Sequence, residues 1–143
     1  MPSFGQRSID NLKTCHPKLI QVMQAAIIDG PDFSVICGHR SVEEQQELYA
    51  IGRTKPGKIV THVDGIEKLS NHNHFPSLAV DIAPYPIDWD NREQFFLLAG
   101  YVMATARSLK IPLRWGADWN QNFRSGDETF IDLPHFELLP EKN

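Results

Sequence analysis

Two short clusters of histidine and acidic residues constrain this chain more than any other feature of its sequence. The first cluster spans residues 70–81, SNHNHFPSLAVD, and the second spans residues 132–137, DLPHFE. Zn²⁺ takes imidazole nitrogen and carboxylate oxygen as ligands, and a catalytic site leaves one of four positions to water. Two histidines and one aspartate would leave such a site with a net charge of about +1, suited to polarising a carbonyl and acidifying water. Spacing alone leaves a second interpretation open, in which these are surface histidines beside ordinary strand ends.

The length, charge and hydrophobicity of the chain predict its domain number and exclude some kinds of partner. With 143 residues it is close to the commonest size of one domain, so we expect residues 1–143 to form a single domain. Its 14 Lys and Arg residues against 18 Asp and Glu residues leave no basic stripe, and we expect no nucleic-acid partner. No run of about 20 apolar residues is present, so we expect no membrane span.

The N-terminal residues and the cysteines bear on the compartment. Residues 1–12 contain no apolar core of a secretory signal, so we expect none. The two cysteines, Cys15 and Cys37, form no C-x-x-C pair, and we expect both to be reduced thiols. Both features predict a protein made for a reducing cytoplasm.

Hydrophobic periodicity and capping residues predict a mixture of helices and short strands. Helices are expected over residues 8–13, 17–28, 41–49 and 91–109, and strands over residues 33–37, 78–83, 113–115 and 135–138. Ser41 and Glu44 have the spacing of a capping box, and Asp90 is expected to cap the longest helix. Residues 53–77 form the longest irregular stretch, and loops of this length are usually functional or disordered. Because the elements do not alternate as regular βαβ units, we expect the α+β class.

The order of several motifs resembles that of a known family. Residues 70–81 resemble the S-x-H…A-x-D motif, and residues 132–135 the [DE]-x-x-H motif, of the D-Ala-D-Ala carboxypeptidase and L-alanyl-D-glutamate endopeptidase family of zinc peptidases. Residues 38–54 look like the family's G-x-R-S…Q-x-x-L-Y-x-x-G-R-T segment, and residues 115–119, WGADW, look like the stretch before its last motif. The matches follow the family order from about Phe4 to Leu138.

The resemblance implies a fold and a set of site residues. A small antiparallel sheet flanked by helices would carry one zinc ion per chain on its open face. His72, Asp81 and His135 would be the zinc ligands. Asp132 would act as general base and then general acid, with an ordinary pKa of about 4. Arg40 would donate to the developing oxyanion, the alternative being a surface ion pair.

Some assignments are less direct. His74 lies seven residues before Asp81, which is the family's usual separation, but the S-x-H-N context points to His72, which we expect to be the ligand. Asp118 could orient a ligand imidazole or hold a turn. Gln45 could face the cleft, the core or solvent, and His62 is interpreted as a surface residue.

The resemblance implies hydrolysis of the stem peptide of bacterial peptidoglycan. Asp132 stands where the D-Ala-D-Ala enzymes carry Glu and the L-alanyl-D-glutamate branch carries Asp, so we expect cleavage of the L-Ala–D-Glu bond. Two alternatives remain: a D-Ala-D-Ala carboxypeptidase or dipeptidase, and a non-catalytic wall-binding module on the same zinc scaffold. The chain looks like a single-domain bacteriophage endolysin. We expect a monomer that accumulates in the host cytoplasm and reaches the wall once the inner membrane is permeabilised.

Overall fold

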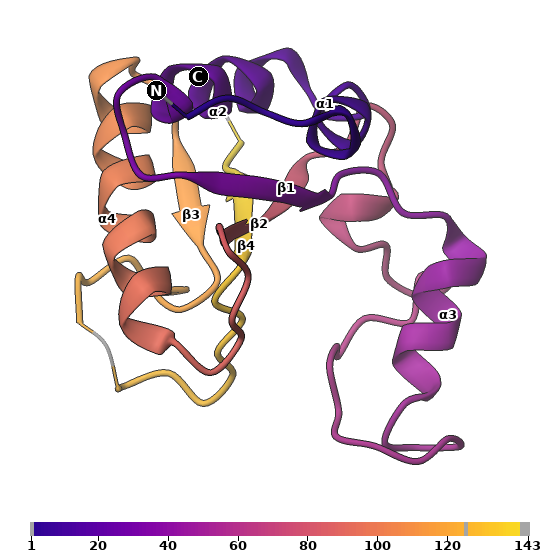
Figure 1. Cartoon of the computed structure of the whole chain (residues 1–143). Coiled ribbons are helices and arrows are strands. Elements are labelled where there is room, and N and C mark those ends of the chain that lie inside the picture. Colours follow the sequence, from indigo (N-terminus) through magenta and orange to yellow (C-terminus); the bar gives the residue numbers. More distant parts are fainter. Residues whose placement is uncertain (1, 125, 141–143) are drawn as a thin grey trace.

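The computed structural model describes residues 2–124 and 126–140. These residues form the α+β fold that the sequence predicts, with an antiparallel sheet and helices beside it (Figure 1). The elements, in chain order, are α1 (Gln6–Leu12), α2 (Pro17–Ile27), β1 (Phe33–Cys37), α3 (Val42–Ala50), the 3-10 helix η1 (Asn71–Asn73), β2 (Ala79–Pro84), α4 (Arg92–Ser108), β3 (Leu113–Trp115) and β4 (His135–Leu138).

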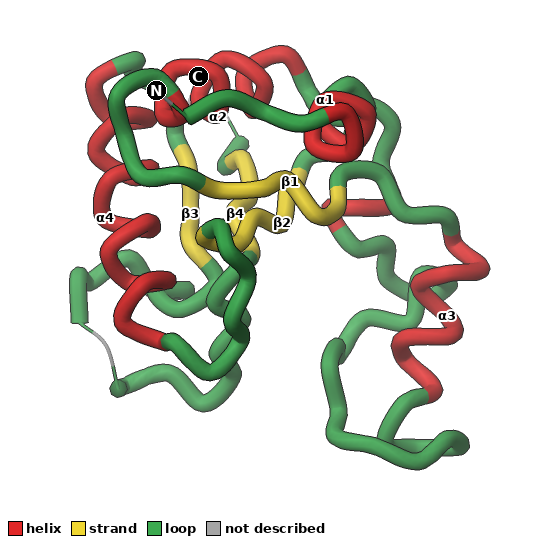
Figure 2. Tube along the Cα trace, viewed as in Figure 1, coloured by secondary structure: helices red, strands yellow, loops and turns green. Residues whose placement is uncertain are grey.

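The four strands pair in the order β1-β2-β4-β3, and each pair is antiparallel (Figure 2). The register brings three chemically active residues into one row across the sheet. Asp81 on β2 is paired with Cys37 on β1 and with His135 on β4. A register shift between Val35 and Cys37 marks an irregularity in β1 at this row. Segments distant in the sequence therefore meet at Asp81.

The two faces of the sheet differ in chemistry because successive residues of a strand point to opposite faces. Val80 on β2 and Phe136 on β4 belong to the hydrophobic core, which α1, α2 and α4 complete. Asp81, His135 and Glu137 alternate with those core residues and lie on the other face. In Figure 1, α3 and the loop that follows it extend away from the sheet and the other helices.

The ends of two helices test the capping predictions. The capping box at α3 is confirmed, since Ser41 Oγ accepts from Glu44 N and the Glu44 carboxylate accepts from Ser41 N. The cap predicted for α4 was wrong, because Asn91, one residue later, accepts from Gln94 N. Asp90 instead belongs to a preceding turn in which its N–H donates to Asp88.

Two further expectations concern the chain as a whole. Within residues 2–124 and 126–140, no helix has the length and apolarity needed to cross a bilayer. Cys15 and Cys37 are both free thiols, as expected.

Candidate metal centre

Three donor atoms from different elements converge at the row described above. His72 Nε2, from η1, lies 3.2 Å from Asp81 Oδ1 and 3.2 Å from His135 Nδ1. The third edge of this triangle, from His135 Nδ1 to Asp81 Oδ1, is 3.3 Å. Bonds of about 2.0–2.2 Å to a tetrahedral ion would separate its ligand atoms by about 3.3–3.6 Å. The triangle is close to the spacing that one small cation requires.

Hydrogen bonds behind the two imidazoles fix their orientation. His72 Nδ1 lies 2.7 Å from the carbonyl oxygen of Gly38, and His135 Nε2 lies 2.8 Å from Glu137 Oε1. If each of these nitrogens donates its hydrogen, His72 Nε2 and His135 Nδ1 keep their lone pairs directed at the triangle. Glu137 is itself held by Arg114, whose Nη2 donates to it over 2.7 Å. This is the arrangement that metal-binding histidines commonly have.

The electrostatics of the triangle favour a positive charge at its centre. Burial alone would lower the pKa of both histidines, but Asp81 outweighs it and raises the pKa of His72 to about 10 and that of His135 to about 9. Burial would raise the pKa of Asp81, yet the two histidines hold it well below its usual range. The carboxylate of Asp81 therefore favours positive charge at this point, which a bound cation can supply.

Asp132 borders the triangle without joining it. Its Oδ2 lies 4.0 Å from His135 Nδ1, and its backbone N–H donates to Gly116 O over 2.7 Å. Gly116 permits this approach, because a Cβ there would lie 2.3 Å from the Asp132 carbonyl oxygen. Burial and then the charge of Asp81 raise the pKa of Asp132 to about 6, so the expected ordinary value was wrong. A nearby cation would act in the opposite direction.

Arg40 lies on the opposite side of Asp81. Its Nη2 is 3.6 Å from Asp81 Oδ2, and its Nη1 donates to Gln45 Oε1 over 2.9 Å. The backbone N–H of Arg40 also donates to the carbonyl oxygen of His72. The guanidinium is therefore held in place beside the triangle, and its side chain is 15% exposed rather than being a surface group.

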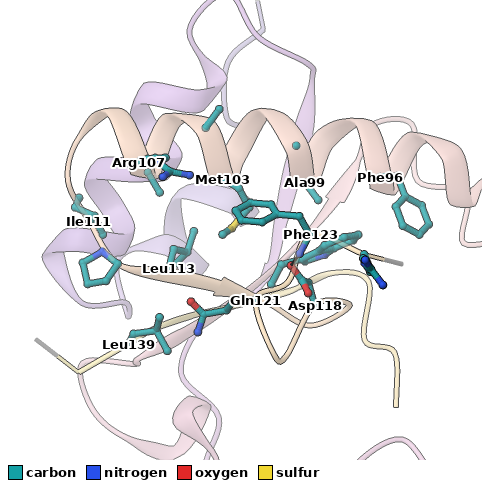
Figure 3. Close-up of a pocket in the computed structure, with 16 residues that line it drawn as sticks. Phe96, Ala99, Met103, Arg107, Ile111, Leu113, Asp118, Gln121, Phe123 and Leu139 are labelled. Carbon is teal, nitrogen blue, oxygen red and sulfur yellow. Dashed lines mark hydrogen bonds between the residues drawn. The ribbon is translucent and has the colours of Figure 1, made fainter. Parts of the chain in front are cut away.

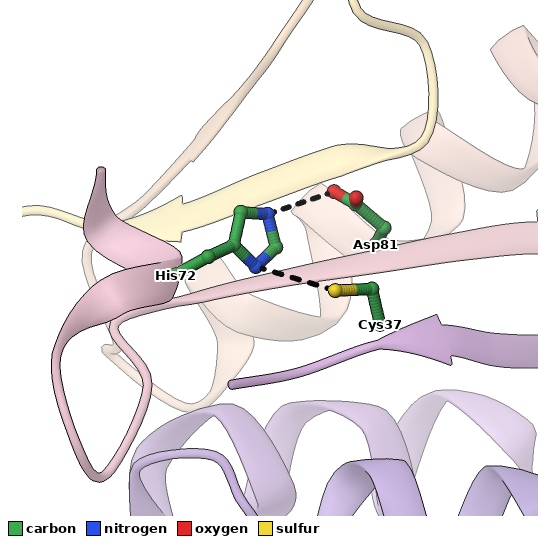
Figure 4. A group of neighbouring side chains, drawn as sticks. All are labelled: Cys37, His72 and Asp81. Carbon is green, nitrogen blue, oxygen red and sulfur yellow. Dashed lines mark hydrogen bonds and ion pairs between the residues drawn. The ribbon is translucent and has the colours of Figure 1, made fainter. Parts of the chain in front are cut away.

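Cys37 offers a competing donor. Cys37, His72 and Asp81 lie close enough together to hold an ion, and the Cys37 sulfur is 3.9 Å from His72 Nδ1 (Figure 4). Asp81 faces the other nitrogen of the ring, Nε2. One ion cannot bind both nitrogens of one imidazole, and Nδ1 already contacts Gly38 O at 2.7 Å. We therefore favour His135 over Cys37 as the third donor.

A cleft of about 540 Å³ opens over the triangle. One wall comes from the loop after α3 and from η1, and the other from the sheet and the loop before β4. The two walls touch where the exposed ring of His62 meets Phe130 edge to face, with ring centroids 4.9 Å apart. Trp119 stacks on Phe130 and tilts against His135. The cleft residues include Arg40, Val60, His62, Lys68, His72, Asp81, Arg114, Trp119, Phe130, Asp132, His135 and Glu137.

The structure brings the five sequence-predicted site residues, Arg40, His72, Asp81, Asp132 and His135, around this cleft. His74 is exposed at the end of η1 and is not among its lining residues. Asp118 holds a turn, because its carboxylate accepts from the N–H groups of Asn122 and Phe123. Its alternative role beside a ligand imidazole falls to Glu137.

Sequence reasoning missed Glu137, Cys37 and the position of His62 in the cleft. For Glu137 a signal existed, since it lies two residues after His135 on a strand and must share its face. For His62 no local signal existed, because its partner Phe130 belongs to a loop far along the chain.

A second, larger cavity of about 750 Å³ lies between α4 and the segments around β3 (Figure 3). Its lining is mostly apolar, with Met103, Leu113 and Phe123 among its residues. Among the described residues that line it there is no histidine or cysteine, and its one carboxylate, Asp118, is engaged in the turn. Size therefore does not identify the reactive site in this protein.

Comparisons with known proteins identify the family to which this chain is similar. The model of the family "Phage L-alanyl-D-glutamate peptidase" matches residues 2–139. The L-alanyl-D-glutamate peptidase of Escherichia phage T5 is 31% identical over 143 residues, covering 95% of this chain and 97% of the relative. The peptidoglycan L-alanyl-D-glutamate endopeptidase CwlK of Bacillus subtilis is 37% identical over 127 residues, which are 81% of this chain and 66% of CwlK.

A solved structure extends the likeness to the fold. The crystal structure of the L-Ala D-Glu endopeptidase ChiX of Serratia marcescens superposes with a TM-score of 0.67 at 27% identity. The superposition covers 96% of this chain and 90% of ChiX. The family resemblance and the fold class expected from the sequence are both confirmed.

Proposed function

This chain belongs to the phage L-alanyl-D-glutamate peptidase family and is a peptidase of the peptidoglycan stem peptide, and we propose that it cuts the L-Ala–D-Glu bond with one zinc ion. His72 Nε2, Asp81 Oδ1 and His135 Nδ1 hold that ion. The observation that carries the proposal is the donor triangle with edges of 3.2–3.3 Å, backed by Gly38 and Glu137. Two imidazoles and one carboxylate are a donor set typical of catalytic zinc.

When bound, zinc supplies a Lewis acid that polarises the scissile carbonyl and lowers the pKa of water toward about 7. Residues of the chain orient the zinc ligands. Gly38 O and Glu137 keep the imidazoles in the tautomers that leave the required lone pairs free. Arg114 holds Glu137 in turn and so acts on the site only through it.

Asp132 is the proton carrier. Its carboxylate borders the triangle at 4.0 Å from His135 Nδ1, near enough to take a proton from the attacking water but outside the donor set. It then passes the proton to the leaving amine of D-Glu, as a general base that becomes a general acid. The ionised form must dominate for the first step, and a neighbouring cation favours that form.

Arg40 stabilises the oxyanion that forms as water adds to the carbonyl. Gln45 and Asp81 hold its guanidinium beside the triangle, so it does not have to be ordered during the reaction. A preorganised donor of this kind is worth about 3–4 kcal/mol of transition-state stabilisation in other enzymes.

Digestion of defined muropeptides tests the function. The purified, zinc-loaded protein should release peptides that begin with D-Glu and leave L-Ala on the muramic acid, as read by mass spectrometry. Elemental analysis of the same sample after dialysis should give about one zinc per chain. Release of free D-Ala alone would favour the D-Ala-D-Ala carboxypeptidase instead. A metal-free protein that cleaves and ignores chelators would contradict the metal assignment.

The biological setting that we propose is host lysis by a phage, with the monomeric protein reaching the wall from the host cytoplasm. The similarity to the phage T5 peptidase over 95% of this chain supports that setting. Expression in bacteria should leave cells intact until the inner membrane is permeabilised, after which turbidity should fall. Turbidity that falls without permeabilisation would contradict it.

A further inference from the structure

Lys68 lines the metal cleft, and its ammonium group has no charged partner among the described residues. The other two cations that line the cleft are engaged, since Arg40 lies against Asp81 and Arg114 against Glu137. The side chain of Lys68 is exposed, and in residues 2–124 and 126–140 we find no ion pair or hydrogen bond to its ammonium group.

The backbone of Lys68 is nevertheless held by hydrogen bonds. One carboxylate oxygen of Asp64 accepts from the N–H groups of residues 66, 67 and 68, at 2.9–3.3 Å. The carbonyl oxygen of Lys68 in turn accepts from Gly65 N over 3.0 Å. Two residues further on, Ser70 caps η1, which carries His72. Lys68 therefore lines the cleft from a fixed backbone, four residues before His72, a donor of the triangle.

The substrate carries a charge that this cation would match. D-Glu, the residue after the scissile bond, has two carboxyl groups, and the stem continues through only one of them. The other remains either a carboxylate or, where the wall is amidated, a neutral carboxamide. If the stem continues through the side-chain carboxyl group of D-Glu, the free group is its α-carboxyl group. The carbon of that group is only two bonds from the leaving amine nitrogen, so the group enters the cleft near Asp132. An unpaired carboxylate would be repelled there by Asp132.

We propose that Lys68 binds the free carboxylate of D-Glu and makes the protein selective for stem peptides that are not amidated at this residue. The proposal rests on the proposed function and adds the substrate class to it. Arg40 is assigned to the oxyanion and Arg114 is paired with Glu137, which leaves Lys68, among the described lysines and arginines that line the cleft, to bind a second anionic group of the substrate. The pairing acts on binding, because the carboxylate is charged in both the ground state and the transition state.

Two synthetic peptides test the proposal, N-acetyl-L-Ala-γ-D-Glu-L-Lys and the same peptide with D-isoglutamine in place of D-Glu. The zinc-loaded protein should cleave the carboxylate peptide with a kcat/KM about five- to tenfold higher, as expected for one charge-assisted contact in a partly exposed cleft. Lys68→Met should lower kcat/KM for the carboxylate peptide by about that factor, mainly through KM, and bring it near the value for the amide peptide. Lys58→Met removes a lysine of the same loop that does not line the cleft, and it should keep the wild-type preference.

The outcomes separate the two proposals. Equal cleavage of both peptides by the wild type, or a preference that survives Lys68→Met, would overturn the role of Lys68 and leave the proposed function standing. Failure of the zinc-loaded wild type to cleave either peptide between L-Ala and the next residue would overturn the proposed function itself.

Discussion

The two walls of the metal cleft are held in place by different interactions. The sheet wall presents Asp81 and His135 from strands whose alternate residues, Val80 and Phe136, are buried in the core. The loop wall, residues 60–73, has no regular structure before η1, and Val60 is 45% exposed. Core packing therefore fixes the donor atoms on one wall, while hydrogen bonds of single side chains fix the other.

Gln45 supports the loop wall from within the protein. Its side chain is fully buried, and its Nε2 donates to Val63 O over 2.8 Å and to Thr61 Oγ1 over 3.2 Å. Its Oε1 accepts from Arg40, so the same amide also orients a residue proposed to act in catalysis. Metal binding should therefore depend on the two sheet-wall donors, Asp81 and His135, and on the single loop-wall donor, His72, while the rest of the loop wall should affect substrate handling.

The largest effect should come from the one donor of the triangle that the loop wall contributes. His72→Ala should abolish both zinc binding and peptidase activity, because it removes one of the three donor atoms of the triangle. His74→Ala is the matched control, since His74 is exposed two residues away, and it should keep both properties within about tenfold. Zinc content and hydrolysis of purified peptidoglycan are the measurements. The reverse pattern would make His74 the ligand and show that the loop rearranges when metal binds.

The next largest effect should come from Asp132, whose loss should affect turnover and not zinc binding. Asp132→Ala should keep about one zinc per chain and lower turnover by about 10² or more, as expected when a positioned base is lost. The site retains its donor triangle, so zinc content is the internal control. Loss of zinc in this variant would mean that Asp132 is a ligand, and the assignment of Asp81 would have to be revised.

Glu137→Gln should show how much the orientation of His135 by Glu137 contributes to zinc affinity. An amide is a weaker acceptor for His135 Nε2 and weakens the ion pair with Arg114, so zinc affinity should fall by about 10–100-fold. Asp118→Asn changes a carboxylate that holds only a turn and should leave zinc affinity unchanged. Competition with a chelator of known affinity gives the numbers. Equal affinities for the two variants would remove Glu137 from the metal centre.

The same contrast explains what the sequence could predict. The strands of the sheet wall and the residues Asp81 and His135 were predictable, because alternation and local motifs encode them. Glu137 was predictable in principle from the same alternation but was missed. The loop wall was not predictable in this way. The burial of Gln45 and the contact of His62 depend on which distant segments meet, and no local pattern specifies that.

A smaller effect should follow from loosening the loop wall. Gln45→Ala should leave zinc content unchanged, because all three donors remain. It should speed tryptic cleavage at Arg53, Lys55 or Lys58, since residues 61 and 63 lose their hydrogen bonds to the Gln45 amide. Limited proteolysis followed by mass spectrometry measures this. Cleavage rates equal to those of the wild type would mean that other contacts hold the loop.

The smallest effect should come from the contact that His62 and Phe130 make across the cleft. The His62–Phe130 edge-to-face pair is worth about 0.5–1.5 kcal/mol, so His62→Ala should change KM for a stem peptide by a few-fold. The direction identifies the role of the pair. A lower KM would mean that the contact must open to admit substrate, and a higher KM would mean that the two rings hold the bound peptide. His39→Ala removes an edge-to-face pair with Phe75 that does not line the cleft, and it should leave KM unchanged. If both variants leave KM unchanged, the contact joins the walls without taking part in binding.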